Sequence, residues 1–74
     1  MSYDPVEIVR FEKVIGTVVS KYRVEIFSDG GAVVLDEDKD AIVGIFEDEG
    51  FEAKPEVYKE AFAYVEKLGY RRIG

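Results

Sequence analysis

The sequence predicts an α+β domain, residues 1–74, made of a helix, a β-hairpin and two further helices. Three patterns carry this prediction. Apolar residues recur at helical spacing in the N-terminal quarter. An Asp-Gly pair separates two apolar runs in the middle of the chain, as in a tight hairpin. Proline and glycine bracket an amphipathic segment near the C-terminus.

The first expected helix runs from Asp4 to about Ser20. Asp4 can cap it, Pro5 suits the first helical position, and Glu7 stands three residues after the cap. Its inner face would carry Ile8, Phe11, Ile15 and Val18. Because the segment is rich in β-branched residues, a strand from Val6 to Phe11 is the alternative.

The expected hairpin joins Tyr22–Phe27 to Ala32–Leu35. Asp29-Gly30 would form a two-residue turn, because both turn positions require a positive φ. In that register Ile26 lies opposite Val33. The core face then consists of Tyr22, Val24, Ile26, Val33 and Leu35.

The opposite face of this hairpin would carry Phe27, Ala32 and Val34. Apolar residues beside open strand edges indicate a contact surface in a small chain that has no disulfide. We therefore predict that these three residues form an interaction surface. The partner would be another protein or a second copy, paired as a two-fold homodimer.

Two helices are expected in the C-terminal half. The first spans Asp40–Glu49, with Gly50 as its end. Lys54-Pro55-Glu56 opens the second, which ends at Gly69 and whose inner stripe is Val57, Ala61, Val65 and Leu68. Short strands at 51–53 and 70–73 would flank it as a βαβ unit.

Acidic residues gather between the hairpin and the next helix. Asp36, Asp38, Asp40 and Glu47 stand at the first, third, fifth and twelfth positions of one segment. This spacing resembles the calcium loop of EF-hand proteins. The resemblance, which covers residues 36–47 alone, implies Ca²⁺ held by those four carboxylates and by the Ile42 carbonyl.

The segment departs from the EF-hand pattern in two ways. Ala41 stands where that family has a glycine, and the expected element before the loop is a strand where that family has a helix. The alternative is that Asp38 or Asp40 caps the following helix and that the other carboxylates are solvated.

Composition limits the function. The chain has no Cys and no His, so the usual thiol nucleophiles and imidazole bases are absent, and we do not expect an enzyme. A net charge of −6 disfavours nucleic-acid binding. No apolar run approaches the ~20 residues of a membrane span. The lack of Cys predicts a cytoplasmic location.

Composition also predicts thermal stability. Asn, Gln, Cys and His are all missing, and 35% of the residues are charged. Few thermolabile residues and many charged ones are typical of thermophile proteins.

Three functions fit these patterns. The first is a protein–protein interaction module or small subunit of a larger assembly. The second is a Ca²⁺-binding domain that uses the segment Asp36–Glu47. The third, which depends on charge alone, is an acidic inhibitor or antitoxin-like partner of a basic protein.

Overall fold

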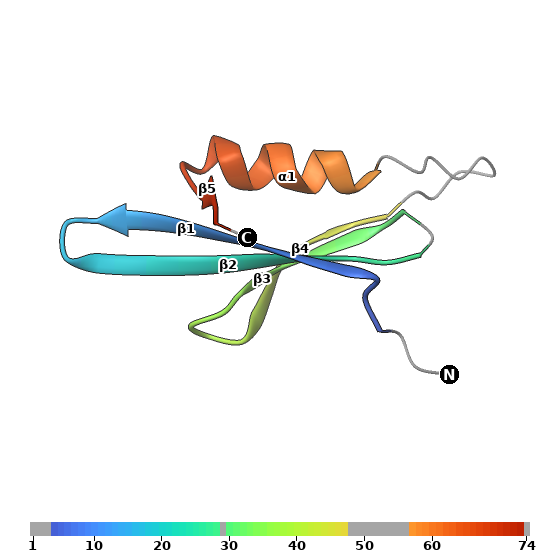
Figure 1. The fold of residues 1–74 in the computed structure, drawn as a ribbon, viewed down its shortest axis with the longest axis horizontal. Coiled ribbons are helices and arrows are strands. Elements are labelled where there is room, and N and C mark those ends of the chain that lie inside the picture. Colours follow the sequence, from blue (N-terminus) through green and yellow to red (C-terminus); the bar gives the residue numbers. More distant parts are fainter. Residues whose placement is uncertain (1–3, 29, 48–56, 74) are drawn as a thin grey trace.

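The computed structural model describes residues 4–28, 30–47 and 57–73, which form an antiparallel sheet of five strands with one helix on one face (Figure 1). The sheet order is β4-β3-β2-β1-β5. The prediction of a helix, a hairpin and two further helices is therefore wrong. The elements are β1 (Glu7–Ile15), β2 (Val18–Ile26), β3 (Ala32–Asp36), β4 (Ala41–Phe46), α1 (Val57–Lys67) and β5 (Arg71–Arg72).

The expected N-terminal helix is replaced by the long β1–β2 hairpin. Its two-residue turn is Gly16-Thr17, and Gly16 has a φ of 62°. A glycine at the first loop position is typical of a type II′ turn, whose twist matches that of the flanking strands. The Val and Ile residues on both sides favour extended backbone. The alternative prediction, a strand over Val6–Phe11, is correct in type but covers only part of β1.

The predicted β2–β3 hairpin is present, but its register differs. The Phe27 N–H donates a hydrogen bond of 2.9 Å to the Gly31 carbonyl, so the loop between them has three residues and not two. Ile26 therefore pairs with Ala32 and not with Val33. A shift by one residue moves a strand's side chains to the other face of the sheet.

The change of register corrects the predicted core. Tyr22, Val24 and Ile26 do share one face, but Ala32 and Val34 join them there. Val33 and Leu35, which were assigned to the core, lie on the opposite face.

The expected helix at 40–49 is also wrong. Ala41–Phe46 forms β4, paired with β3, and residues 48–50 lie outside the described residues. β4 has three β-branched residues and a glycine among its six residues, which favours a strand over a helix. The register shifts between Val34 and Leu35, which places a bulge at Val43.

The C-terminal helix is confirmed from Val57 onward as α1, while its predicted opening at 54–56 lies outside the described residues. It buries Val57, Ala61 and Val65, as the stripe predicted, whereas Leu68 lies beyond its end and is exposed. Gly69, with a φ of 95°, ends the helix, and the Tyr70 N–H returns to the Val65 carbonyl. This is a Schellman-type end.

The expected flanking strands have different outcomes. The segment 51–53 lies outside the described residues. Within 70–73, Arg71–Arg72 forms β5, which pairs antiparallel with β1.

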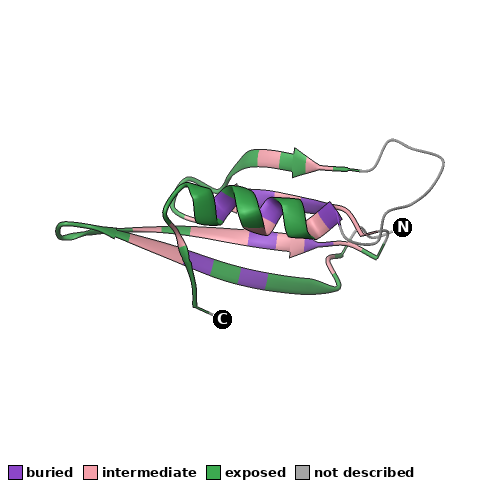
Figure 2. Cartoon of the chain, turned by 90° about the horizontal axis from the view of Figure 1, so that it is seen from above, coloured by how far each residue is buried: buried purple, intermediate pink, exposed green. Residues whose placement is uncertain are grey.

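The core lies between α1 and one face of the sheet (Figure 2). Its fully buried side chains are Val9, Phe11, Val24, Val34 and Val65, and Ala61 is buried among them. Phe46 and Tyr64 close one side of this layer, with ring centroids 5.6 Å apart. In the part of the chain that the structure describes, no element covers the other face of the sheet, which we call the open face.

Candidate functional site

An apolar patch lies on the open face over β3 and β4. Val33 pairs with Ile45, and Leu35 pairs with Ile42, so the four side chains are cross-strand neighbours. Ile42 and Ile45 are 61% and 58% exposed, whereas Val33 and Leu35 are half-buried. We call these four residues the open-face patch.

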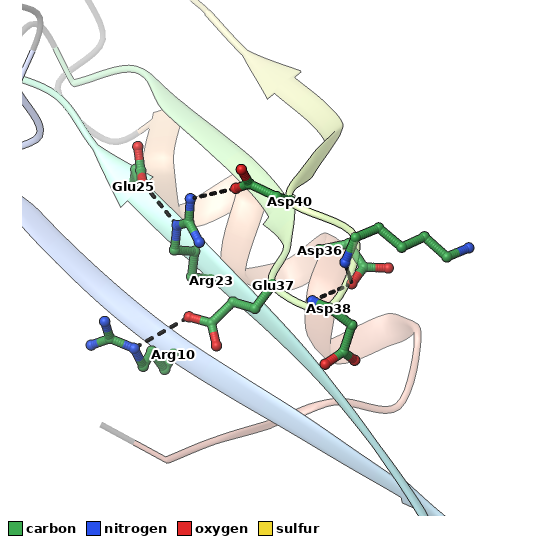
Figure 3. Close-up of polar contacts among 8 residues, drawn as sticks. Arg10, Arg23, Glu25, Asp36, Glu37, Asp38 and Asp40 are labelled. Atoms are coloured by element: carbon green, nitrogen blue, oxygen red, sulfur yellow. Dashed lines mark hydrogen bonds and ion pairs between the residues drawn. The ribbon is translucent and has the colours of Figure 1, made fainter.

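A group of charged side chains borders this patch (Figure 3). The Arg23 Nε donates to Glu25 at 2.8 Å, and an Arg23 terminal nitrogen lies 3.5 Å from an Asp40 oxygen. The hydrogen bond with Glu25 raises the pKa of Arg23 further above its ordinary value. Arg23 therefore stays charged at every physiological pH, and the centre of the open face remains polar beside the apolar patch.

The outer edge of β4 is the second feature of this region. β4 is the end strand of the sheet, and no described residue pairs with its outer side. Its sequence, Ala-Ile-Val-Gly-Ile-Phe, contains no charge. An uncharged, β-branched edge offers unpaired N–H and C=O groups to another strand.

A second exposed apolar cluster lies at the tip of the β1–β2 hairpin. This hairpin projects beyond the helix and the other strands (Figure 1), and the molecule is 45 Å long. The tip residues Val14, Ile15, Val18 and Val19 are all exposed. Unlike the open-face patch, they are distributed over both faces of the hairpin, because neighbours along a strand alternate in direction.

The predicted interaction surface is not assembled as expected. Ala32 and Val34 are buried beneath α1, and Phe27 is half-buried at the end of β2. The three-residue loop places Ala32 and Val34 on the helix-covered face. The β3 residues that lie on the open face are instead Val33 and Leu35, which are half-buried.

The predicted calcium ligands lie in the β3–β4 hairpin, where two of them have structural contacts. An Asp36 side-chain oxygen accepts hydrogen bonds from the backbone N–H groups of Asp38 (2.9 Å) and Lys39 (3.3 Å), which stabilises the turn. Asp40 has a φ of 50° and faces Arg23.

Glu47 lies far from the other predicted ligands. It follows the last residue of β4, at the other end of the strand from Asp36, which pairs with Ala41. At 3.3 Å per residue, that is about 20 Å from the turn. Among the described residues, no three acidic side chains are grouped so that they could hold a metal ion.

Two tyrosines link the projecting hairpin to the C-terminal segment. The rings of Tyr22 and Tyr70 stack with centroids 4.2 Å apart, and the Tyr70 hydroxyl lies 2.7 Å from the Ser20 hydroxyl. A side-chain hydrogen bond with Tyr70, together with burial, raises the pKa of Tyr22 to about 12. Tyr22 is therefore neutral at physiological pH, and its stacking on Tyr70 is a structural contact.

The remaining findings add limits on the function. In the described ranges, no helix is both long and apolar enough to cross a membrane. No protein-family model, curated protein or solved structure matches the chain. The function must therefore be inferred from the surface itself, where the open-face patch adjoins the uncharged outer edge of β4.

Sequence reasoning missed this patch for two reasons. Val33 and Leu35 were placed in the core, and Ile42 and Ile45 were placed on a helix. The signal that could have located them was the uncharged run Ala41–Phe46, whose β-branched residues fit an edge strand.

Proposed function

We propose that this chain is a small protein-binding module, or a subunit of a larger assembly, that contacts its partner through the open-face patch. The observation that carries the proposal is the one-sided architecture. A helix covers one face of the sheet, while two isoleucines of the patch are more than half exposed on the other face. Contiguous exposed apolar surface with a charged border is typical of a protein-interaction site.

The size of the chain supports this proposal. A domain of 74 residues has a small core and gains stability when a partner covers its remaining apolar surface. The absence of Cys from the sequence supports a reducing compartment, such as the cytoplasm, as the place where it acts.

The test compares two isoleucines of equal exposure. Ile45 in the patch and Ile15 at the hairpin tip are both 58% exposed. Ile45→Glu and Ile15→Glu therefore introduce the same charge at equally exposed positions on different surfaces. Both variants and the wild type would be purified under native conditions from the cells that produce the protein.

We expect a stoichiometric partner that accompanies the wild type and Ile15→Glu but is lost with Ile45→Glu. Denaturant unfolding of both variants is the control, because their free energies of unfolding should remain similar. A partner retained by Ile45→Glu, or no partner with the wild type, would contradict the proposal.

A further inference from the structure

The two edges of the sheet are protected differently. At one edge, the middle of β1 is covered at Phe11 and Glu12 by β5, a strand of only two residues that are both arginine. A short, charged edge strand is a common protection against further strand pairing. At the other edge, β4 has six residues without a charge, and no described residue covers it. The edge of β4 is therefore the uncharged one, whereas the edge of β1 is interrupted by two arginines.

Acidic residues stand at both ends of this edge. Asp40 immediately precedes β4, and Glu47 immediately follows it. If two copies paired their β4 strands antiparallel in full register, Asp40 of each copy would lie opposite Glu47 of the other. Like charges directly opposite each other destabilise a strand pair. The net charge of −6 adds repulsion between two copies.

These charges favour a different occupant. We propose, on the basis of the protein-binding function above, that β4 accepts an extended segment of a partner protein as a sixth strand. The segment is apolar in its middle and carries Lys or Arg at both ends. Its backbone pairs with β4, its apolar side chains lie beside Ile42 and Ile45, and its basic ends face Asp40 and Glu47.

The bulge at Val43 determines where the added strand pairs. A bulge interrupts the regular ladder and increases the local twist. The regular part of β4 from Gly44 to Phe46 pairs with Ala32–Val34, and Ile45 of the open-face patch lies in its middle. The added strand therefore forms its regular ladder along Gly44–Phe46, while its basic ends face Asp40 and Glu47 on either side of β4.

The experiment measures the affinity of a synthetic peptide, Lys-Lys-Val-Thr-Val-Thr-Val-Lys-Lys, for the full chain at low salt. The control peptide replaces each Lys by Glu. We expect the basic peptide to bind about tenfold more tightly, since each opposed charge pair contributes roughly 0.2–1 kcal/mol. Amide NMR shifts should be concentrated in β4. Equal affinities, or shifts located elsewhere, would overturn the inference.

Backbone pairing is tested separately from charge. Two versions of the basic peptide carry N-methyl groups on alternate residues, one in each phase. The version that lacks the N–H groups facing β4 should lose binding, and the version methylated in the other phase should retain it. The reason is that strand addition uses the hydrogen-bonding groups of only one edge of the peptide. If both versions bind as well as the parent peptide, there is no strand addition.

The acidic ends are tested by two double variants that each remove two negative charges. Asp40→Asn with Glu47→Gln should reduce the preference for the basic peptide to threefold or less. Asn tolerates the positive φ of Asp40. The control, Asp4→Asn with Glu7→Gln, changes exposed residues near the far edge and should leave the preference unchanged. Equal effects would indicate attraction to net charge alone and would overturn the inference.

The alternative occupant of the β4 edge is a second copy of this chain. Sedimentation distinguishes the two possibilities. We expect the chain to sediment as a monomer of 8.4 kDa. If the wild type is a dimer and Ile45→Glu dissociates it, β4 pairs with a second copy and the proposed partner strand is contradicted. This inference can fail while the proposed function stands, since Ile45→Glu can abolish a partner complex that uses the open face without strand addition.

Discussion

Two adjacent valines occupy opposite faces of the sheet. Val34 is fully buried beneath α1, whereas Val33 is half-buried on the open face. We expect Val34→Ala to lower the free energy of unfolding by about 2 kcal/mol, because it leaves a cavity in the core. Val33→Ala should lower it by about 0.5 kcal/mol, as a partly exposed substitution does.

Urea unfolding of the two valine variants checks the register of β3. The register with a two-residue loop predicts the reverse order, with Val33→Ala the more damaging change. That order would contradict the three-residue loop between Phe27 and Gly31.

Tyr22 is predicted to titrate late. Its pKa of about 12 in the folded protein exceeds the ordinary value of 10.0, so the folded state holds this proton more tightly than the unfolded state. The stabilising effect is complete below pH 10 and is lost as the pH rises from 10 towards 12. Stability should therefore fall over that interval.

Spectrophotometric titration of tyrosinate measures this effect. In Tyr70→Phe the pKa of Tyr22 should move back towards its ordinary value, since the hydrogen bond with Tyr70 is the largest cause of the shift. Tyr64→Phe is the control, because the charge of Tyr64 contributes least to the raised pKa of Tyr22. An unchanged titration in Tyr70→Phe would contradict the proposed contact.

At the scale of the elements, the β3–β4 turn depends on one carboxylate. Asp36 accepts two backbone hydrogen bonds, so Asp36→Ala should cost about 1 kcal/mol of stability. Asp36→Asn should cost less, because its side-chain carbonyl is still an acceptor. Thermal unfolding of the two variants measures this difference.

The same turn gives a direct test of calcium binding. Because Glu47 lies at the far end of β4, millimolar Ca²⁺ should leave the melting temperature of the wild type unchanged. It should equally leave that of Asp36→Asn with Asp38→Asn unchanged. Stabilisation of the wild type alone would show that the segment binds Ca²⁺ after all.

A helix or strand could be predicted where residues such as Pro and Gly mark its ends. It could not be predicted where the apolar spacing fits both a helix and a strand. α1 was identified because Pro55 and Gly69 bracket one apolar stripe. In β1 the spacing of Ile8, Phe11 and Ile15 also fits a helix, although the β-branched residues around them favour a strand. Gly16 was the missed signal, since glycine is unfavourable inside a helix and favourable in a hairpin turn.

The open-face patch could not be predicted from short stretches of sequence, because its residues come together only through the pairing of β3 with its neighbours. Ser28–Gly31 is compatible with a two-residue or a three-residue loop, and the two lengths place β3 on opposite faces. Placing Val33 and Leu35 on the open face required the actual register. Pairing them with Ile42 and Ile45 required β4 to be a strand.

For the whole molecule, composition predicts a melting temperature above about 80 °C, compared with roughly 45–65 °C for mesophile domains. The reasons are the absence of Asn, Gln, Cys and His from the sequence and its 35% charged residues. Differential scanning calorimetry with a reversibility check measures it. A reversible transition below about 65 °C would contradict the inference from composition.

The pairing of β5 with β1 determines how the molecule responds to tension. Arg72 pairs with Phe11 and Arg71 with Glu12, and the Ile73 N–H donates to the Arg10 carbonyl at 2.9 Å. Because the strands are antiparallel, the chain enters β1 and leaves β5 at the same end of the pair. A force that pulls Asp4 away from Ile73 thus opens these hydrogen bonds one after another, as in a zipper, and does not load them together. The C-terminal strand peels away first, and the force then reaches α1 while the β1–β4 meander is still intact.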